Sequence, residues 1–244
     1  MRIVLLSDIH ANVTALESVL ADVKTIGAFD GFALLGDLVN YGPRPNETIE
    51  IIKNLPSNKL LVNIWGNHEF SVFGGSPERF ATDRGRSALQ FTKSVLTEES
   101  KEYLYNSMDR NGFCQFRTKD CSILFMHGNP DDPFWGKFGA GDVNDERFSA
   151  YDYVISGHSH IPFYVEHFFP SEDTQYRNRK RTIFINPGSV GQPRNHNPYA
   201  QYAILDTESG NYEHRSIQYD IEKEQALFSD KIDVFYKERI KLGI

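Results

Sequence analysis

The first third of the chain alternates between short apolar runs and amphipathic stretches. Continuous apolar runs at residues 3–6 and 32–35 are typical of buried strands, and residues 60–65 are expected to form a third strand. Between them, apolar residues recur at helical spacing from residue 12 to about 25, and a second helix is expected at 46–55. Alternation of this kind predicts a parallel sheet with helices packed on it.

The remainder of the chain changes from helical to strand-like patterns. Residues 76–107 are polar-rich and helical in pattern, and a tail at 221–240 is typical of one or two amphipathic helices. Between them we expect short strands at residues 112–117, 121–126, 152–156, 162–168, 182–185, 200–206 and 211–218. Because no linker or repeat separates the halves, we expect a single domain spanning residues 1–244.

Composition narrows the classes of function only slightly. With 40% hydrophobic and 24% charged residues, the 244-residue chain resembles an ordinary globular protein. Its formal net charge of -7 argues against extended nucleic-acid binding. The dense basic stretch at 177–181 is predicted to be a solvated hairpin tip, with a binding site as the alternative.

The cellular compartment is inferred from the lengths of the apolar runs and from the two cysteines. The apolar stretch at residues 3–6 is too short for the core of a signal peptide, and no apolar run approaches the length of a membrane span. The two cysteines, Cys114 and Cys121, lie on the arms of a predicted hairpin that turns through residues 118–120. Pairing about that turn sets Cys114 opposite Leu124 and Cys121 opposite Arg117, so we expect no disulfide. The sequence therefore predicts a reduced, cytoplasmic protein without membrane contact.

Five polar segments carry the candidate chemistry, and each follows a strand-like run. They are Asp8-Ile9-His10, Gly36-Asp37, Gly66-Asn67-His68-Glu69, Met126-His127-Gly128 and Gly157-His158-Ser159-His160. Five of the eight histidines fall inside them. Since ligand sites of open α/β sheets lie beyond the carboxyl ends of the strands, we expect these segments to converge. Their carboxylate, imidazole and amide groups suffice for two divalent metals that share one carboxylate.

Taken singly, each segment has a purely structural alternative. Asp8 and His10 could cap a loop, Asp37 could be a helix N-cap, and a lone histidine such as His127 is usually a satisfied core residue. The spacing of Asp8 and His10 points both side chains the same way if the backbone there is extended. The joint occurrence of five such strand ends favours the metal interpretation.

The order of these residues resembles the calcineurin-like metallophosphoesterase superfamily, whose pattern runs Asp-x-His, Gly-Asp, Gly-Asn-His-Asp/Glu, His and Gly-His-x-His. The resemblance implies an α/β fold, a four-layer α/β/β/α sandwich with two mixed β-sheets. It also implies two metals, of which manganese, iron or zinc suit the mixed ligands. The implied ligands of one ion are Asp8, His10, Asp37 and His160, and Asp37 bridges to a second ion completed by Asn67, His127 and His158. His68 would not bind metal but would act as general acid, and Asn67 would also hold a phosphate oxygen.

Residues 7–12, 36–43 and 186–193 resemble the small single-domain bacterial phosphoesterases of this superfamily, which include phosphodiesterases and dinucleoside-polyphosphate hydrolases. The implied activity is hydrolysis of a phosphodiester or phosphoanhydride, with a small nucleotide-type substrate, by attack of a hydroxide that bridges the two metals. The alternatives are a phosphomonoesterase on a small metabolite or phosphoprotein, and a non-catalytic interaction scaffold. In the loop at 129–136, Phe134 and Trp135 could stack a nucleobase, or pack the loop or a contact between subunits of a homo-oligomer.

One departure from the superfamily concerns phosphate binding. Protein phosphatases of the superfamily carry Asp-Arg where this chain has Asn40-Tyr41, and that arginine grips the phosphate. Asn40 can still orient His68 by a hydrogen bond. We regard Arg44 and Arg194 as candidates to replace the missing arginine, and Asn12 as a further substrate contact through its amide.

Overall fold

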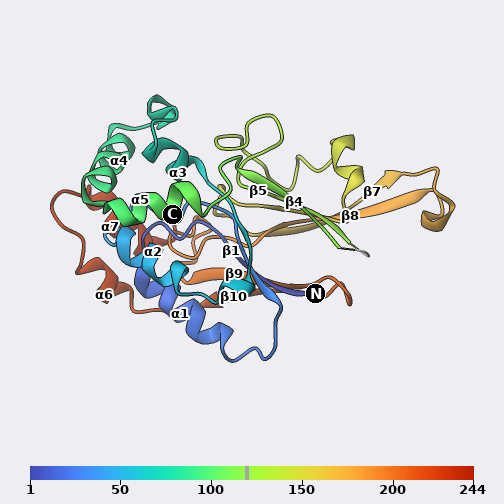
Figure 1. Ribbon diagram of the computed structural model, residues 1–244, viewed down its shortest axis with the longest axis horizontal. Helices are drawn as coiled ribbons and strands as arrows, with labels where there is room; N and C mark the ends of the chain where they lie inside the picture. The colour runs from blue at the N-terminus through green and yellow to red at the C-terminus, as the bar shows by residue number, and fades with distance from the viewer. Residues whose placement is uncertain (119–120) are drawn as a thin grey trace.

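Two β-sheets stacked face to face form the centre of the molecule (Figure 1). The computed structural model describes residues 1–118 and 121–244. Over those residues, the first sheet has the strand order β10-β9-β1-β2-β3 and the second has the order β4-β5-β6-β8-β7. The strands are β1 (Arg2–Leu6), β2 (Gly31–Leu34), β3 (Leu60–Asn63), β4 (Phe113–Arg117), β5 (Ser122–Met126), β6 (Tyr153–Ser156), β7 (Phe163–Pro170), β8 (Arg179–Asn186), β9 (Ala200–Asp206) and β10 (Tyr212–Ile217).

Both sheets mix parallel and antiparallel pairs. In the first sheet β1, β2 and β3 run parallel, and β9 returns antiparallel to β1 and to the edge strand β10. In the second sheet β5, β6 and β8 run parallel, and β4 and β7 form antiparallel edges. The predicted fold class, an α/β sandwich with two mixed sheets, is therefore confirmed.

The strands of the first sheet separate two apolar layers. In β1, Val4 and Leu6 belong to the core beneath the helices, whereas Ile3 and Leu5 belong to the core between the sheets. This alternation follows from the period of two along a strand. The helices, most of which gather at the left of Figure 1, are α1 (Val13–Val23), α2 (Pro45–Lys53), α3 (Asn67–Val72), α4 (Asp83–Val95), α5 (Glu98–Asn106), α6 (Ile221–Gln225) and α7 (Val234–Leu242).

The outer face of the second sheet is covered by the long segment at 128–150. Its side chains Phe138, Val143 and Phe148 pack on Phe184 and its neighbours. The segment ends in the short 3-10 helix Glu146–Ala150, so this layer is thinner than the helical layer on the first sheet. Among the described residues, no helix is long and apolar enough to cross a membrane.

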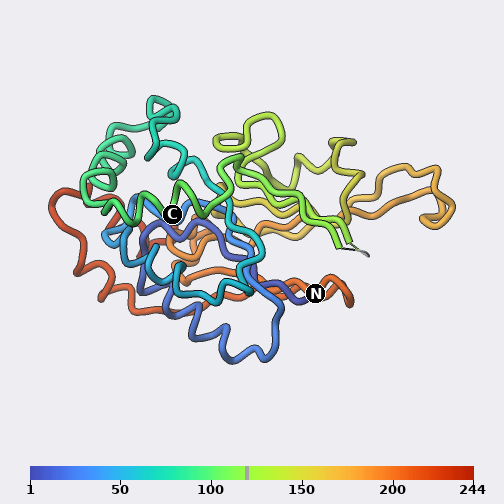
Figure 2. The backbone as a smooth tube through the Cα atoms, viewed as in Figure 1, coloured from blue at the N-terminus to red at the C-terminus, as the bar shows by residue number. Residues whose placement is uncertain are grey.

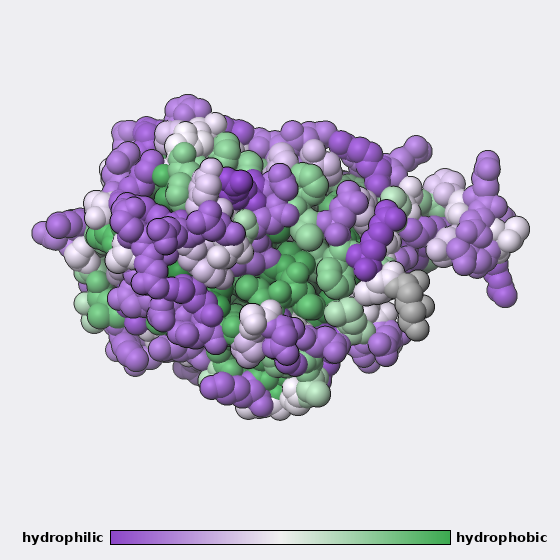
Figure 3. All heavy atoms as spheres, viewed as in Figure 1, coloured by the Kyte–Doolittle hydropathy of each residue, from purple (hydrophilic) through white to green (hydrophobic). Residues whose placement is uncertain are grey.

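The hairpin of β7 and β8 differs from the prediction at its outer end. Strand β8 begins at Arg179, so three residues of the basic stretch lie in the strand, and only Arg177 and Asn178 lie outside it. The long edge pairing continues to Pro170 opposite Arg179, which extends the hairpin beyond the first sheet. Figures 2 and 3 show this hairpin projecting at the right, with a mainly hydrophilic surface at its end.

The hairpin of β4 and β5 has a register one residue away from the predicted one. Cys114 pairs with Phe125, not Leu124, and Arg117 pairs with Ser122, not Cys121. The backbone N–H of Thr118 donates to Cys121 O; Lys119 and Asp120, part of the predicted turn, lie outside the described residues. Both cysteines are free thiols.

Candidate metal centre and catalytic cleft

The loops after the strands adopt a backbone conformation that the sequence did not predict. Asp8, His10 and Asp37 have φ values of 54°, 49° and 56°, and His158 and His160 have 64° and 58°. The extended backbone expected between Asp8 and His10 was therefore wrong. Left-handed φ is uncommon for residues other than glycine and costs about 1–3 kcal/mol where the side chain is bulky. Such strain concentrates at functional sites.

Hydrogen bonds between the loops hold this strained backbone. The N–H groups of Asp8 and His10 donate to Gly36 O and Asp37 O at 3.1 and 2.9 Å. The buried carboxylate of Glu69 accepts from the N–H groups of Asp37, Leu38, Val39 and Gly66. Glu69 thus ties the loop after β2 to the start of α3, a helix that sequence reasoning missed.

Glycine is required at Gly66 because a Cβ there would collide with the Asp37 carboxylate. The strand end can therefore approach Asp37 closely only with a glycine at this position. Asp37 in turn accepts from the His68 N–H at 3.0 Å through Oδ1, which leaves Oδ2 facing the histidines.

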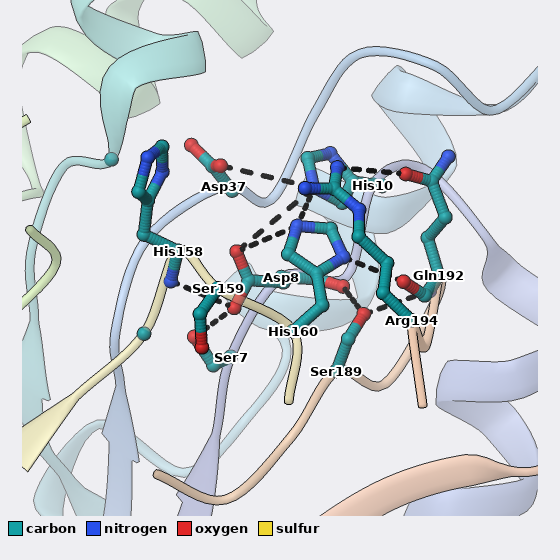
Figure 4. Close-up of polar contacts among 12 residues, drawn as sticks. Ser7, Asp8, His10, Asp37, His158, Ser159, His160, Ser189, Gln192 and Arg194 are labelled. Atoms are coloured by element: carbon teal, nitrogen blue, oxygen red, sulfur yellow. Dashed lines mark hydrogen bonds and ion pairs between the residues drawn. The ribbon is translucent and has the colours of Figure 1, made fainter. Parts of the chain in front are cut away.

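One group of candidate ligands joins both sheets. His10 Nε2 and His160 Nε2 lie 3.1 Å apart, and His160 Nε2 lies 3.3 Å from Asp8 Oδ1. Asp37 Oδ2 lies 3.8 Å from His10 Nε2. Figure 4 shows the carboxylates and imidazoles of this group turned toward a common space. Asp8, His10, Asp37 and His160 are all buried and close enough to hold one ion.

A second group shares Asp37 with the first. His127 Nε2 lies 3.3 Å from Asp37 Oδ2 and 3.1 Å from Asn67 Oδ1. His158 reaches the same amide oxygen through Nδ1 at 3.0 Å. Asp37, His127 and His158 could hold another ion, with Asn67 as the fourth ligand. The structure thus brings together all seven residues predicted as metal ligands.

The outward nitrogens of three histidines set the direction of the inward ones. Nδ1 of His10, His127 and His160 lies 3.3, 2.7 and 2.5 Å from the backbone oxygens of Val39, Leu35 and Gln192. A carbonyl only accepts, so each Nδ1 carries a proton and each Nε2 is the nitrogen left to bind a metal at the centre. Fixing a metal-binding histidine through its other nitrogen is a recurrent feature of metal sites.

Two buried carboxylate oxygens test whether metals fit this centre. Among the described residues, Asp8 Oδ1 and Asp37 Oδ2 have no hydrogen-bond partner. A buried acceptor without a partner costs free energy unless a cation or donor satisfies it. Both oxygens face the inward histidine nitrogens, and this mixture of donors suits borderline divalent ions. The residues therefore fit two divalent metals; the identity of the ions is not determined by the geometry.

Burial and charge set the protonation of these groups. Burial lowers the pKa of His10 and His160 well below the usual value, and that of His158 to about 3. Burial also acts on His127, but the Asp37 carboxylate outweighs it and raises the pKa of His127 to about 9. Burial raises the pKa of Asp8 to about 7. A cation binding here would therefore compete with protons on His127 and Asp8.

His68 lies beside the metal centre and is held by Asn40. The Asn40 Oδ1 accepts from Tyr41 N and Thr92 Oγ1, so its amide nitrogen faces His68 Nδ1 at 2.6 Å. His68 Nδ1 must then accept, which puts the ring proton on Nε2, 3.7 Å from Asp37 Oδ2. Burial lowers the pKa of His68 to about 4, which favours this neutral form.

A cleft of about 290 Å³ opens over the centre. Asp37, Asn67, His68, His158 and His160 line its floor, and its walls include residues from distant parts of the chain, namely Tyr41, Arg79, Phe80, Trp135, Lys137 and Arg194. Trp135 meets Phe80 edge to face at 5.0 Å, whereas Phe134 stacks on Phe70 at 4.2 Å. Of the two aromatics in that loop, only Trp135 lines this cleft.

The three predicted substrate contacts have different surroundings. Arg194 lines the cleft, and its Nε has no hydrogen-bond partner among the described residues. Arg44 instead donates to the buried carboxylate of Glu224 and does not line the cleft. Asn12 caps α1 and donates to Gly191 O and Tyr219 Oη. The structure therefore supports Arg194 and commits Arg44 and Asn12 to contacts within the fold.

Sequence reasoning missed Arg79, Phe80 and Lys137 as cleft residues. Lys137 lies one residue beyond the aromatic loop at 129–136, and the proximity of that loop was the only sign in the sequence that Lys137 could line the cleft. Arg79 and Phe80 lie in a segment whose pattern indicated only a polar helix.

The comparison with protein families decides the classification of the chain. Residues 1–210 match the calcineurin-like phosphoesterase superfamily domain. The chain belongs to the calcineurin-like phosphoesterase superfamily. The motif order that suggested this family is confirmed, and the chain has a metallophosphoesterase fold with a candidate metal site.

Similar proteins support the same classification over the full length. The chain is 33% identical to the protein MJ0912 of Methanocaldococcus jannaschii, covering 99% of this chain and 98% of that one. It is 30% identical to a metallophosphoesterase from Sphaerobacter thermophilus, with both chains fully covered and a TM-score of 0.76. The hypothetical protein PH1004 from Pyrococcus horikoshii shares the fold at 21% identity, with a TM-score of 0.74 over 96% of this chain and 97% of that one.

Proposed function

We propose that this protein is a dinuclear metal-dependent phosphoesterase that hydrolyses phosphodiester or phosphoanhydride bonds of a nucleotide-type substrate. One observation carries the proposal: two buried carboxylate oxygens without a hydrogen bond, Asp8 Oδ1 and Asp37 Oδ2, face histidine nitrogens at the floor of an open cleft. Superfamily membership supports a metal-dependent phosphoesterase in general terms. The bond and substrate class are our inference.

Asp37 and Asn67 have distinct roles in this proposal. Asp37 is shared by both groups of ligands and so fixes the spacing of the two positions. When bound, two divalent ions supply an activated water and positive charge opposite the phosphate. Asn67 lies between His127 and His158 and lines the cleft, so its amide nitrogen can donate to a phosphate oxygen.

His68 is the proposed hydrogen-bond donor that stabilises the leaving oxygen. Its Nε2–H points toward the cleft because Asn40 occupies Nδ1. Asn40 cannot stabilise an imidazolium as a carboxylate would, so His68 stays neutral and donates a hydrogen bond as charge develops on the leaving oxygen. This arrangement suits a leaving group that needs only partial stabilisation, such as a nucleotide phosphate.

The walls of the cleft support a substrate larger than a simple phosphomonoester. Arg194 and Lys137 add positive charge beyond the metal ligands, and Arg79 forms an ion pair with Asp132 at 2.6 Å beside Trp135. A phosphoanhydride carries additional charge that these cations can neutralise. The exposed part of the Trp135 ring can stack a nucleobase, a contact worth about 1–3 kcal/mol.

Initial rates on matched substrates test the proposal. Protein saturated with Mn²⁺ is assayed with bis-p-nitrophenyl phosphate, p-nitrophenyl phosphate, diadenosine tetraphosphate and adenosine monophosphate, with Asp37→Asn as the inactive control. We expect kcat/KM to be highest for diadenosine tetraphosphate and higher for the diester than for the monoester. Preference for both monoesters would establish a phosphomonoesterase. No turnover above that of Asp37→Asn would exclude the enzymatic function.

A further inference from the structure

The C-terminal segment from residue 211 onward lies outside the match to the superfamily domain, which ends at residue 210. It nevertheless packs against Tyr41, a residue of the cleft wall. Figure 2 shows it in red, wrapping the end of the molecule where α4 and α5 lie. Helix α7 of this segment buries Tyr236 and Ile240, which are each 3% exposed.

Tyr236 packs directly behind a wall of the cleft. Its ring stacks on Tyr41, with centroids 4.4 Å apart and an angle of 18° between the planes. Tyr236 also belongs to a small apolar cluster with Ala88 of α4 and Ile232. The Tyr236 ring is therefore held by Ala88 of α4 and by Ile232, which precedes α7.

Tyr41 connects this stack of tyrosine rings to His68. Its ring meets His68 edge to face at 4.5 Å and lies 4.9 Å from the ring of His10. Tyr41 and Asn40 both have positive φ, at 64° and 73°. A bulky residue in this conformation persists only where its surroundings hold it. Tyr236 supplies that support on the side away from the histidines.

The C-terminal segment is anchored independently at several points. The Glu224 carboxylate accepts from Thr14 N at 3.2 Å and from Thr14 Oγ1 at 2.6 Å. The backbone N–H of His196 donates to Gly243 O at 2.7 Å, which holds the end of α7 next to the loop that carries Arg194. These contacts make the segment a rigid support.

We propose that the C-terminal segment supports the catalytic cleft from behind, with Tyr236 as a positioning residue that acts through Tyr41 on His68. The contacts run in sequence from Tyr236 to Tyr41 and from Tyr41 to His68, so displacement of the outer ring frees the inner ones. This inference rests on the proposed function for its kinetic consequences. Its structural consequence, the environment of the His68 ring, is independent of any activity.

The kinetic test compares Tyr236→Ala and Tyr236→Phe with Ile240→Ala, a matched control that removes a buried side chain from the same helix. We expect Tyr236→Ala to lower kcat about 10- to 100-fold, the cost of a small misplacement, with metal content unchanged and KM changed less than about threefold. Tyr236→Phe keeps the stacked ring and should restore kcat to within about twofold of wild type. Ile240→Ala should lower the melting temperature comparably without lowering kcat.

The double variant Tyr41→Ala/Tyr236→Ala tests the path of the effect. If Tyr236 acts through Tyr41, the double variant should match Tyr41→Ala alone to within about twofold, because contacting residues that act in series are not additive. Multiplied effects, or equal losses of kcat in Tyr236→Ala and Ile240→Ala, would overturn the proposal. So would a Tyr236→Phe variant as slow as Tyr236→Ala.

A measurement without substrate separates failure of this inference from failure of the proposed function. In metal-free protein with ¹⁵N-labelled histidine, the signals of His68 are assigned by their loss in His68→Gln. We expect Tyr236→Ala to shift them, because the Tyr41 ring beside them moves, and Ile240→Ala to leave them in place. Unshifted signals in Tyr236→Ala would overturn the inference whether or not the wild-type protein is active.

Discussion

The two candidate metal positions share Asp37 but differ in burial and in ligand charge. The first, formed by Asp8, His10, Asp37 and His160, has two carboxylates, and all four residues are buried. The second has Asp37 as its one carboxylate, completed by His127, the half-buried His158 and the neutral amide of Asn67. More ligand charge and less solvent favour tighter binding of a divalent ion. We therefore expect the first position to hold its ion firmly and the second to exchange its ion and meet the substrate.

Loss of the shared ligand should have the largest effect. Asp37→Ala removes the carboxylate common to both positions and also the acceptor of the His68 N–H. We expect elemental analysis to find both ions lost, and kcat/KM to fall by more than the roughly 10- to 100-fold that loss of an outer partner costs. Two retained ions in this variant would show that Asp37 is not the bridge.

Loss of His68 should leave both metal positions intact. His68 contacts the centre but faces the cleft, so His68→Ala should keep the metal content of the wild type. We expect turnover to fall about 10²–10³-fold, the usual cost of removing one hydrogen-bond donor from a developing oxyanion. If metal is lost instead, His68 is a ligand and its role is misassigned.

Substitution of one histidine at each metal position tests directly whether the two positions differ in how firmly they hold an ion. His158→Ala removes a ligand of the second position, and His160→Ala removes a ligand of the first. After dialysis against metal-free buffer, we expect His158→Ala to retain about one ion per chain and His160→Ala to retain less. Equal retention in the two variants would show that burial does not distinguish the positions.

The two positions should also differ in how their metal affinity depends on pH, and we expect this effect to be smaller than those of the substitutions. The Asp37 carboxylate overcomes burial to raise the pKa of His127 to about 9, so a proton must leave His127 before the second ion binds. Affinity at the second position should therefore rise with pH between 7 and 9, by at most about tenfold per pH unit, since an ion already bound at Asp37 lowers the pKa of His127. The first position depends on Asp8, whose pKa burial raises to about 7, so its affinity should be nearly constant above pH 7 and fall below it. Calorimetric titration with Mn²⁺ across this range measures both.

Convergence of the motifs could be predicted from the sequence because it depends on local signals. Each candidate ligand follows a strand, and parallel strand ends meet at one edge of a sheet. Asp8 and Asp37 therefore had to approach each other on one sheet, and His127 and His158 on the other. The left-handed backbone at these residues was not predictable, since it is imposed by hydrogen bonds between loops distant in sequence.

Contacts between distant segments account for the other differences. Arg44 was a reasonable phosphate ligand until its partner Glu224, 180 residues away, could be seen. Tyr236 gave no signal because its importance depends on which ring it meets. Nothing local to Arg79 or Lys137 indicated that both would line the cleft.

Anomalous diffraction from a crystal soaked with Mn²⁺ tests the central claim most directly. We expect two peaks about 3.5–4 Å apart, both in contact with Asp37, with Asp8 on one side and His127 on the other. A single peak, or peaks away from the two unpartnered carboxylate oxygens, would contradict a dinuclear centre.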